Sequence, residues 1–138
     1  MKESVKVSWL GKMSFEAEVD KHKIILDADT SVGGENKGPK PKPLMLVALA
    51  GCTGMDVVSI LKKMRVELDG LNVEVEGHLT EEQPEKFYKM HVIYEFRGKE
   101  LPMDKLNKAI SLSEERYCGV RAIYKKVIKM SSEIRISG

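Results

Sequence analysis

The sequence predicts an α+β domain, with helices gathered on one face of a largely antiparallel sheet. Two kinds of pattern support this prediction. Several short segments have apolar side chains at every second position, which is the period of a strand with one buried face. Two longer segments, residues 43–64 and 103–117, have apolar side chains at helical spacing. The predicted order is strand, strand, strand, buried helix, strand, strand, one or two helices, strand.

The composition is typical of one folded domain spanning residues 1–138. Hydrophobic residues make up 42% of the chain and charged residues 32%, as in a soluble globular protein rather than a disordered or membrane one. The net charge is +2 with both signs interspersed, whereas nucleic-acid-binding proteins concentrate positive charge in a patch. We therefore expect no nucleic-acid or membrane partner. The N-terminal segment MKESVKVSWL reads as a strand rather than a signal peptide, which predicts a cytoplasmic protein.

Three short alternating runs predict a meander of strands at the start of the chain: Val5, Val7 and Trp9, then Phe15, Ala17 and Val19, then residues 24–28. A loop rich in Gly, Pro and Lys follows at residues 29–42. Its prolines keep the backbone extended, but the last proline of the series, Pro43, suits the first turn of a helix.

The helix predicted at residues 43–64 is apolar on all sides over residues 44–50, so we expect this part to be buried on every side. Beyond Thr53 the helix becomes amphipathic. A small two-layer domain can cover only one side of such a helix with its own sheet. A second copy of the chain is the simplest cover for the rest, and the sequence therefore predicts an obligate homodimer.

Gly51 and Gly54 lie on either side of Cys52 in this helix, where each glycine costs about 1 kcal/mol relative to alanine. Either something packs very close to the helix at this point, or the helix is kinked there.

Two further alternating runs predict the next pair of strands: Leu71, Val73, Val75 and Leu79, then Tyr88, Met90, Val92, Tyr94 and Phe96. A helix is predicted from about residue 103 to residue 117, and Gly119 is expected to break or bend it. A short helix at residues 120–126 and a strand at residues 128–136 complete the predicted domain.

The chain has two cysteines, Cys52 and Cys118, and in the cytoplasm such a pair is more often reactive than structural. Either cysteine alone could equally be buried and inert. Cys52 has small neighbours that leave space for a ligand. Cys118 is expected at a helix break, where the following helix, Arg116 and Arg121 would favour its thiolate. One nucleophilic and one resolving cysteine are the minimum needed to reduce a peroxide and close a disulfide.

Three motifs carry a resemblance to a known family: Ala-Gly-Cys-Thr at residues 50–53, Asp-Val-Val-Ser-Ile-Leu-Lys-Lys at residues 56–63, and Ser-x-x-x-Tyr-Cys-x-Val at residues 113–120. Together with the strand order, they resemble the OsmC/Ohr superfamily of osmotically inducible and organic hydroperoxide resistance proteins. The resemblance implies an intertwined homodimer with two sites at the subunit interface and a role in oxidative stress. It also implies reduction of organic hydroperoxides, with Cys52 as the peroxidatic residue and Cys118 as the resolving residue. Electrons would come from a dithiol such as a lipoylated protein.

The chain departs from the family's peroxidases at an arginine–glutamate pair that surrounds the reactive cysteine. Lys12 stands in the first turn where they carry the arginine, and Lys42 and Pro43 stand where they carry the glutamate. Asp56, one helical turn after Cys52, could supply an alternative acid, or could be an ordinary surface or capping residue. These departures leave open a second function, the binding of a small apolar ligand at the dimer interface without redox turnover.

No metal or cofactor is expected from the sequence. The three histidines, His22, His78 and His91, are scattered over predicted strands and loops without the spacing of a zinc site.

Overall fold

The computed structural model describes residues 1–138 and has the predicted order of elements, which confirms the α+β class. The chain forms two compact units, Met1–Met45 and Leu46–Gly138. The prediction of a single domain over residues 1–138 stays a prediction.

The N-terminal unit is an antiparallel meander of β1 (Lys6–Gly11), β2 (Ser14–Val19) and β3 (His22–Leu26). A single 3-10 turn, η1 (Thr30–Val32), lies in the loop that follows. The buried Asp27 carboxylate holds this loop by accepting backbone N–H groups from Ala28, Glu35 and Lys37. The three predicted strands are therefore confirmed, with bounds within two residues of those expected.

The sheet of the N-terminal unit has almost no core of its own. Ala17 is its only buried hydrophobic residue, whereas Trp9 is 66% exposed and Val7 48% exposed. Burying an apolar side chain contributes about 1.5–3 kcal/mol, so leaving these exposed forfeits most of the free energy that could hold the sheet together. This sheet requires a covering surface to be stable.

The C-terminal unit has a second three-stranded sheet, in the order β4 (Gly70–Leu79), β5 (Phe87–Arg97) and β6 (Lys129–Ser137). Strands β4 and β5 form an antiparallel pair, but β5 and β6 run parallel. The expected single antiparallel sheet is thus two sheets, one of them mixed. Parallel strands need a long crossover, and the chain makes it through α2 (Met103–Leu112), η2 (Ser113–Tyr117) and α3 (Gly119–Tyr124).

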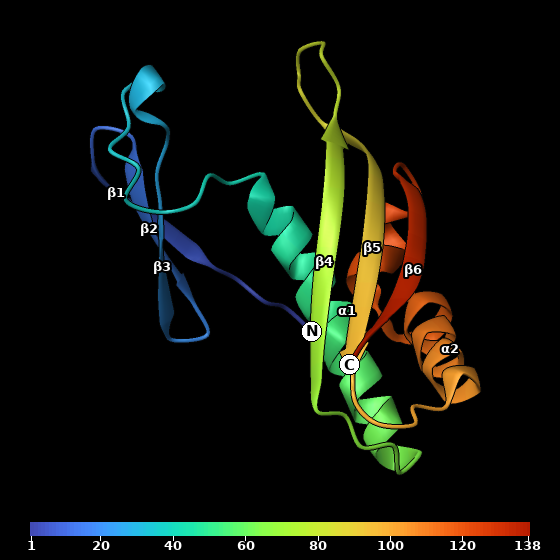
Figure 1. Cartoon of the computed structure of the whole chain (residues 1–138). Helices are drawn as coiled ribbons and strands as arrows, with labels where there is room; N and C mark the ends of the chain where they lie inside the picture. The colour runs from blue at the N-terminus through green and yellow to red at the C-terminus, as the bar shows by residue number, and fades with distance from the viewer. The chain divides into compact units, whose positions relative to one another are not determined.

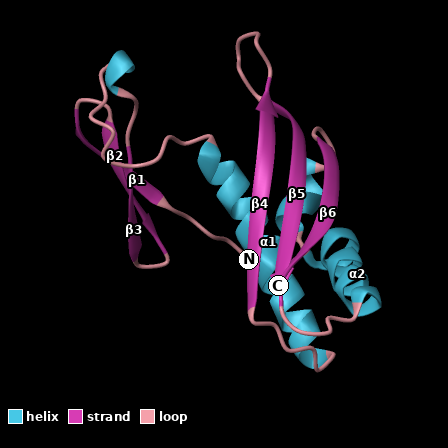
Figure 2. Cartoon of the chain, viewed as in Figure 1, coloured by secondary structure: helices cyan, strands magenta, loops and turns pink.

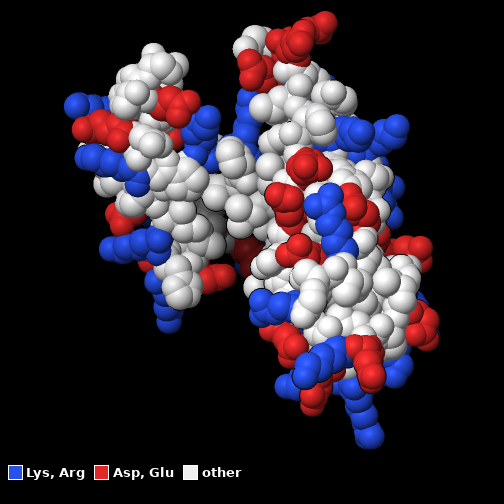
Figure 3. Space-filling view, viewed as in Figure 1, with Lys and Arg blue, Asp and Glu red and all other residues white.

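The helices of this unit lie on one face of the β4–β6 sheet (Figures 1 and 2). Strand β5 is central, so its inward side chains are fully buried between the sheet and the helices. The core consists mainly of Met90, Val92, Tyr94 and Phe96 from β5, Leu49, Val57 and Leu61 from α1 (Pro43–Lys63), and Leu106, Ala109 and Ile110 from α2. The opposite face of the sheet carries charged side chains of both signs (Figure 3). This alternation is what the two-residue period predicts.

Helix α1 begins at Pro43 as predicted and runs without interruption to Lys63. It is long and apolar enough to cross a membrane by length and composition alone, a test that the core helix of a soluble protein also passes. The burial expected on every side of residues 44–50 is not reached within one chain, because Val47 is 62% exposed and Met45 is 38% exposed.

Two interpretations of Gly51 and Gly54 were open, very close packing against the helix or a kink in it. Neither is confirmed within one chain. The helix has no break between Gly51 and Gly54. A Cβ added at Gly51 would meet nothing within 4 Å, and one at Gly54 would be in ordinary contact with Val73 at 3.5 Å. Gly51 therefore leaves open space on the exposed side of the helix.

Candidate functional site

The two sulfur atoms lie close together, although 65 positions separate them along the chain. Cys52 and Asp56 are four residues apart on α1 and so share one side of the helix. Cys118 lies between η2 and α3. The Sγ atoms of both cysteines and a carboxylate oxygen of Asp56 all lie within 4.8 Å of one another. Both cysteines are free thiols.

The position of Cys118 depends on a wide helical turn followed by a new helix start. Its backbone N–H donates to the Ser113 carbonyl at 2.8 Å, which closes the π-helical turn η2. Its own φ and ψ of −77° and 100° are extended, and its Sγ accepts the Arg121 N–H at 3.3 Å as the N-terminal cap of α3. The break predicted near Gly119 is confirmed.

The two thiols differ in environment. Cys118 is only 3% exposed, and Cys52 is partly exposed. Burial is the main cause that raises the pKa of the Cys118 thiol, to about 11. The hydrogen bond from the Arg121 N–H is the next-largest effect and lowers this pKa, whereas the neighbouring Cys52 and Asp56 raise it. The start of α3 does favour the Cys118 thiolate through the Arg121 N–H, as expected, but burial outweighs this effect and the thiol form is favoured. Helix α3 has only six residues, and the Arg121 guanidinium is paired with Glu114 at 3.3 Å.

A chain of buried hydroxyl groups runs beside the thiols and joins three elements. The Thr53 hydroxyl of α1 contacts the Tyr94 hydroxyl of β5 at 2.8 Å and the Ser113 hydroxyl at the end of α2 at 2.9 Å. Ser113 donates to Asp56 at 2.9 Å. Tyr94 donates to Glu114 at 3.0 Å, and desolvation of its buried ring raises the pKa of this phenol, so that it stays protonated. The chain thus connects two carboxylates, Asp56 and Glu114.

The chain of hydroxyl groups has fewer hydroxyl protons than oxygen–oxygen contacts. Four oxygen–oxygen contacts connect Asp56 to Glu114, but the three hydroxyl groups supply only three protons. Because Ser113 and Tyr94 each donate to a carboxylate, Thr53 alone must serve the two remaining contacts, and it can donate to only one. A further proton delivered at Asp56 would allow every contact to become a hydrogen bond.

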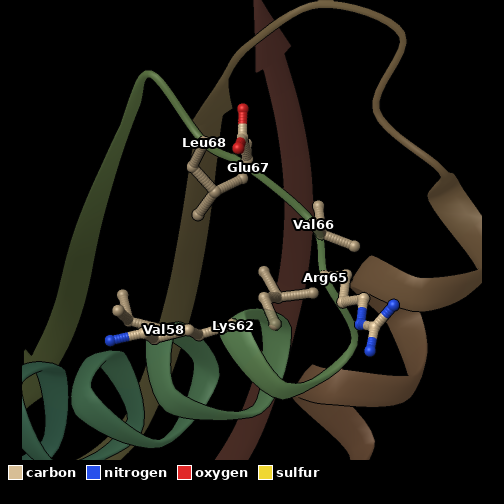
Figure 4. Close-up of a pocket in the computed structure, with 7 residues that line it drawn as sticks. Val58, Lys62, Arg65, Val66, Glu67 and Leu68 are labelled. Atoms are coloured by element: carbon tan, nitrogen blue, oxygen red, sulfur yellow. The ribbon is translucent and has the colours of Figure 1, made fainter.

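A cleft of about 430 Å³ opens beside the thiol site and is bordered by Asp56 itself. Its other lining residues are Ser59, Ile60, Lys63, Leu112 and Tyr117. A second cavity of about 410 Å³ lies at the C-terminal end of α1, between Val58, Lys62 and the segment 65–68 (Figure 4). That cavity holds no thiol and no residue of the hydroxyl chain, whereas the first cleft includes Asp56 of the candidate site.

Other residues singled out from the sequence lie elsewhere. Lys12 forms an exposed ion pair with Glu35 at 3.6 Å within the N-terminal unit. His91 lies on strand β5, with its two ring nitrogens 2.7 Å from Ser131 and 2.7 Å from Glu133. His91 is not among the groups that lie within 4.8 Å of the two sulfurs.

Sequence reasoning missed Thr53, Ser113, Tyr94 and Glu114 as members of the site. A signal for two of them was present, because Thr53 and Ser113 are polar residues in otherwise apolar helical stripes. Tyr94 was expected to be a core residue, which it is, but its hydroxyl also takes part in the chain. Glu114 had no distinguishing signal, since acidic residues are common on helix surfaces.

Comparison with known proteins places the chain in a family. The sequence model described as "OsmC-like protein" matches residues 34–133, and the chain therefore belongs to the OsmC family. This confirms the family resemblance seen in the sequence motifs.

Particular relatives agree with this assignment. Protein YhfA of Escherichia coli is 28% identical over 132 residues, covering 95% of this chain and 96% of its own. The crystal structure of a hypothetical protein from Aquifex aeolicus superposes with a TM-score of 0.84 at 28% identity, covering 100% of this chain and 99% of that one. The organic hydroperoxide resistance protein OhrB of Bacillus subtilis shares the fold, with a TM-score of 0.68 at 16% identity, covering 96% of this chain and 98% of that one.

The raised pKa of Cys118 predicts an unusual pH profile of alkylation. In the Cys52→Ser variant, the rate of Cys118 carboxamidomethylation is expected to keep rising to about pH 11, because only the thiolate reacts and burial, the main cause of the raised pKa, is unchanged. At pH 7 a thiol of that pKa has a thiolate fraction of about one in ten thousand. Mass spectrometry of samples quenched between pH 6 and pH 11 gives the rates.

The Cys118→Ser variant is the matched control, since it retains only the more exposed Cys52. It is expected to be alkylated faster than Cys118 at pH 7. A Cys118 midpoint near 8.5, the value of an ordinary thiol, would contradict the environment described above.

Proposed function

We propose that the protein is a thiol-dependent peroxidase that reduces organic hydroperoxides, with Cys52 as the peroxidatic and Cys118 as the resolving residue. The observation that carries the proposal is the pairing of two unequal thiols within 4.8 Å of each other. Cys52 is the more exposed, as an attacking sulfur must be, whereas the buried Cys118 has a raised pKa and is a poor nucleophile toward solvent species. Membership of the OsmC family supports the same assignment.

In the first step, the Cys52 thiolate attacks the distal oxygen of the hydroperoxide. A sulfur–oxygen bond forms, the oxygen–oxygen bond breaks, and the alkoxide takes up a proton and leaves as the alcohol. Cys52 becomes a sulfenic acid. Ile60, Leu112 and Tyr117 give the adjoining cleft apolar walls, which suit a hydroperoxide with a hydrocarbon substituent.

Asp56 is the group that exchanges the proton in this step. Its carboxylate lies within 4.8 Å of Cys52 Sγ, in reach directly or through one water molecule. A proton taken from the Cys52 thiol would complete the hydrogen bonds of the hydroxyl chain, and the same proton can then be returned to the alkoxide. In this role, Asp56 and the hydroxyl groups bonded to it would do what the arginine–glutamate pair does in the family's peroxidases. Lys12, Lys42 and Pro43 stand at the positions of that pair here and do not supply this function.

In the second step, the Cys118 sulfur attacks the sulfenic sulfur of Cys52. A disulfide forms, the sulfur–oxygen bond breaks, and water leaves with the Cys118 proton. An external dithiol, of which a lipoylated protein is one example, then reduces the disulfide by exchange and is itself oxidised to a disulfide. The raised pKa of Cys118 keeps it protonated at neutral pH, so it does not compete with Cys52 for the hydroperoxide.

The protein acts as a homodimer in this proposal. Val47, Gly51, Met55 and Val58 recur every three or four residues and form an apolar stripe on α1. Only 22% of the most apolar window of this helix is buried within the chain. Gly51 lies in the middle of the stripe with open space around it, which permits a close approach by another backbone. Cys52 adjoins the stripe, so a second copy seated there would border the thiol site.

The same partner would provide the cover that the N-terminal sheet lacks. We propose that each copy of the chain buries apolar surfaces of the other copy, and that the two units of one chain thereby become parts of a single domain. A cytoplasmic location fits the free thiols, because that compartment keeps cysteines reduced.

A second candidate function is the binding of a small apolar ligand without redox turnover. The apolar walls of the cleft favour it, as does the lysine where the family's peroxidases carry an arginine. A thiol titration separates the two functions. One equivalent of hydroperoxide removes both thiols in a peroxidase and neither thiol in a binding protein.

Single-cysteine variants provide the direct test of the peroxidase. Cys52→Ser is expected to abolish consumption of cumene hydroperoxide with a dithiol reductant, because no accessible nucleophile remains. Cys118→Ser is expected to consume one equivalent per chain and to accumulate a sulfenic acid, detected as a dimedone adduct by mass spectrometry. Absence of turnover in the unmodified protein would overturn the proposal.

Replacement of the carboxylate tests the role of Asp56. Asp56→Asn keeps the size of the side chain but removes the proton acceptor, and the second-order rate of Cys52 oxidation at pH 7 is expected to fall about 100-fold. Stopped-flow measurement of thiol loss gives this rate. The matched control is Asp104→Asn on the exposed side of α2. A rate within twofold of the unmodified protein would show that Asp56 does not take the proton.

The homodimer is tested by a charge placed on the apolar stripe. Sedimentation equilibrium of the unmodified protein at micromolar concentration is expected to give twice the 15.5 kDa mass of one chain. Met55→Glu is expected to give monomeric or unfolded protein, because the charge would be buried against the partner. The control is Val127→Glu, which alters a residue 82% exposed in the turn after α3. A folded monomer in the unmodified protein would contradict the dimer.

A further inference from the structure

The two thiols and the nearby carboxylate form a set of groups that suits a metal ion. Cys52, Asp56 and Cys118 each offer one ligand atom, and the three atoms lie within 4.8 Å of one another. Two sulfurs bound to one tetrahedral Zn²⁺ lie about 3.8 Å apart, given a zinc–sulfur bond of about 2.3 Å. The sulfur–sulfur distance would have to shorten by at most about 1 Å for zinc to bind. Rotation of the cysteine and aspartate side chains can provide this change.

The donor atoms select the class of metal. Two sulfurs and one carboxylate oxygen favour a borderline or soft ion such as Zn²⁺ over Mg²⁺ or Ca²⁺, which prefer oxygen ligands alone. Histidine spacing, on which the sequence-based expectation of no metal rested, does not bear on this set because it contains no histidine. Binding as thiolates would release the two thiol protons to solvent.

Surrounding groups already hold two of the three ligands. Ser113 donates a hydrogen bond of 2.9 Å to one oxygen of Asp56, and a carboxylate oxygen that accepts one hydrogen bond retains a further lone pair. The Arg121 N–H donates to the Cys118 sulfur at 3.3 Å. Such outer hydrogen bonds orient ligands and are a regular feature of metal sites. Neither bond would have to break for the metal to enter.

The site also has an entry path and a position for a fourth ligand. Cys52 and Asp56 are partly exposed, and Asp56 borders the cleft of about 430 Å³. Three protein ligands with one position open to solvent give the coordination of a reactive or exchangeable zinc site rather than a closed structural one.

We propose that the reduced protein binds one Zn²⁺ per chain through Cys52, Asp56 and Cys118. The metal would occupy the same sulfurs that the proposed peroxidase uses, so zinc-bound and peroxide-reactive protein are mutually exclusive forms. Binding itself does not depend on the proposed function, because it requires only the reduced thiols and the carboxylate.

Cobalt substitution provides a spectroscopic test on the reduced, full-length protein. Titration with Co²⁺ under argon is expected to produce thiolate-to-cobalt charge-transfer bands and visible d–d bands that saturate at one equivalent per chain. Added Zn²⁺ is expected to remove these bands. Absence of thiolate-to-cobalt bands in the unmodified protein would overturn the proposal and would leave the peroxidase proposal untouched.

Three variants assign the ligands, each checked for folding by circular dichroism. Cys52→Ser and Cys118→Ser are expected to lose the charge-transfer bands, and Asp56→Asn is expected to weaken Co²⁺ binding at least tenfold. The matched control, Asp104→Asn, is expected to bind as the unmodified protein does. Unchanged affinity in Asp56→Asn would exclude the carboxylate and overturn the three-ligand site.

A second readout does not use cobalt or activity. One equivalent of Zn²⁺ is expected to protect Cys52, the more exposed thiol, from carboxamidomethylation at pH 8, and excess EDTA is expected to restore its reactivity. Unchanged alkylation of Cys52 in the presence of Zn²⁺ would contradict a site in which its sulfur holds the metal.

Discussion

The hydrogen bonds of the Thr53 hydroxyl are the interaction on which the rest of the site depends. This hydroxyl joins α1 to β5 through Tyr94 and to the end of α2 through Ser113. These bonds lie in the dry interior between helix and sheet, where an unpaired hydroxyl would cost about 1–3 kcal/mol. The rotation of α1 about its axis is thereby set, and with it the direction of Cys52 and Asp56. The same buried network thus specifies the fold locally and supplies the chemistry of the thiol site.

Burial gives the two thiols different properties although their residue type is the same. Cys118 lies in the core with a raised pKa, whereas Cys52 lies at the margin of the apolar stripe of α1. A pair of identical thiols would compete for an oxidant, and unequal thiols can act in sequence. In the proposed mechanism, Asp56 is the proton acceptor, and the hydroxyl groups connect it to Glu114.

The packing of α1 explains both the apolar side chains that a single chain leaves exposed and the position of the thiol site. Helix α1 packs one side against the β4–β6 sheet and presents Val47, Met55 and Val58 to solvent. The N-terminal sheet likewise exposes Trp9 and Val7. Soluble monomers rarely expose large apolar patches, and both surfaces therefore support the proposed homodimer. In that proposal, self-association would cover both of them and would enclose the thiol site, which adjoins the stripe.

Local pattern in the sequence determined the elements and the family. The two-residue and helical periods predicted each strand and helix, Pro43 marked the start of α1, and the motifs around Cys52 and Cys118 indicated the OsmC family. These features depend on neighbours in the chain, which the sequence displays directly. Tertiary structure alone decided the parallel pairing of β5 with β6, the closeness of Cys118 to Cys52 and the raised pKa of Cys118. Those depend on desolvation and on contacts between residues far apart in the chain, which no local period records.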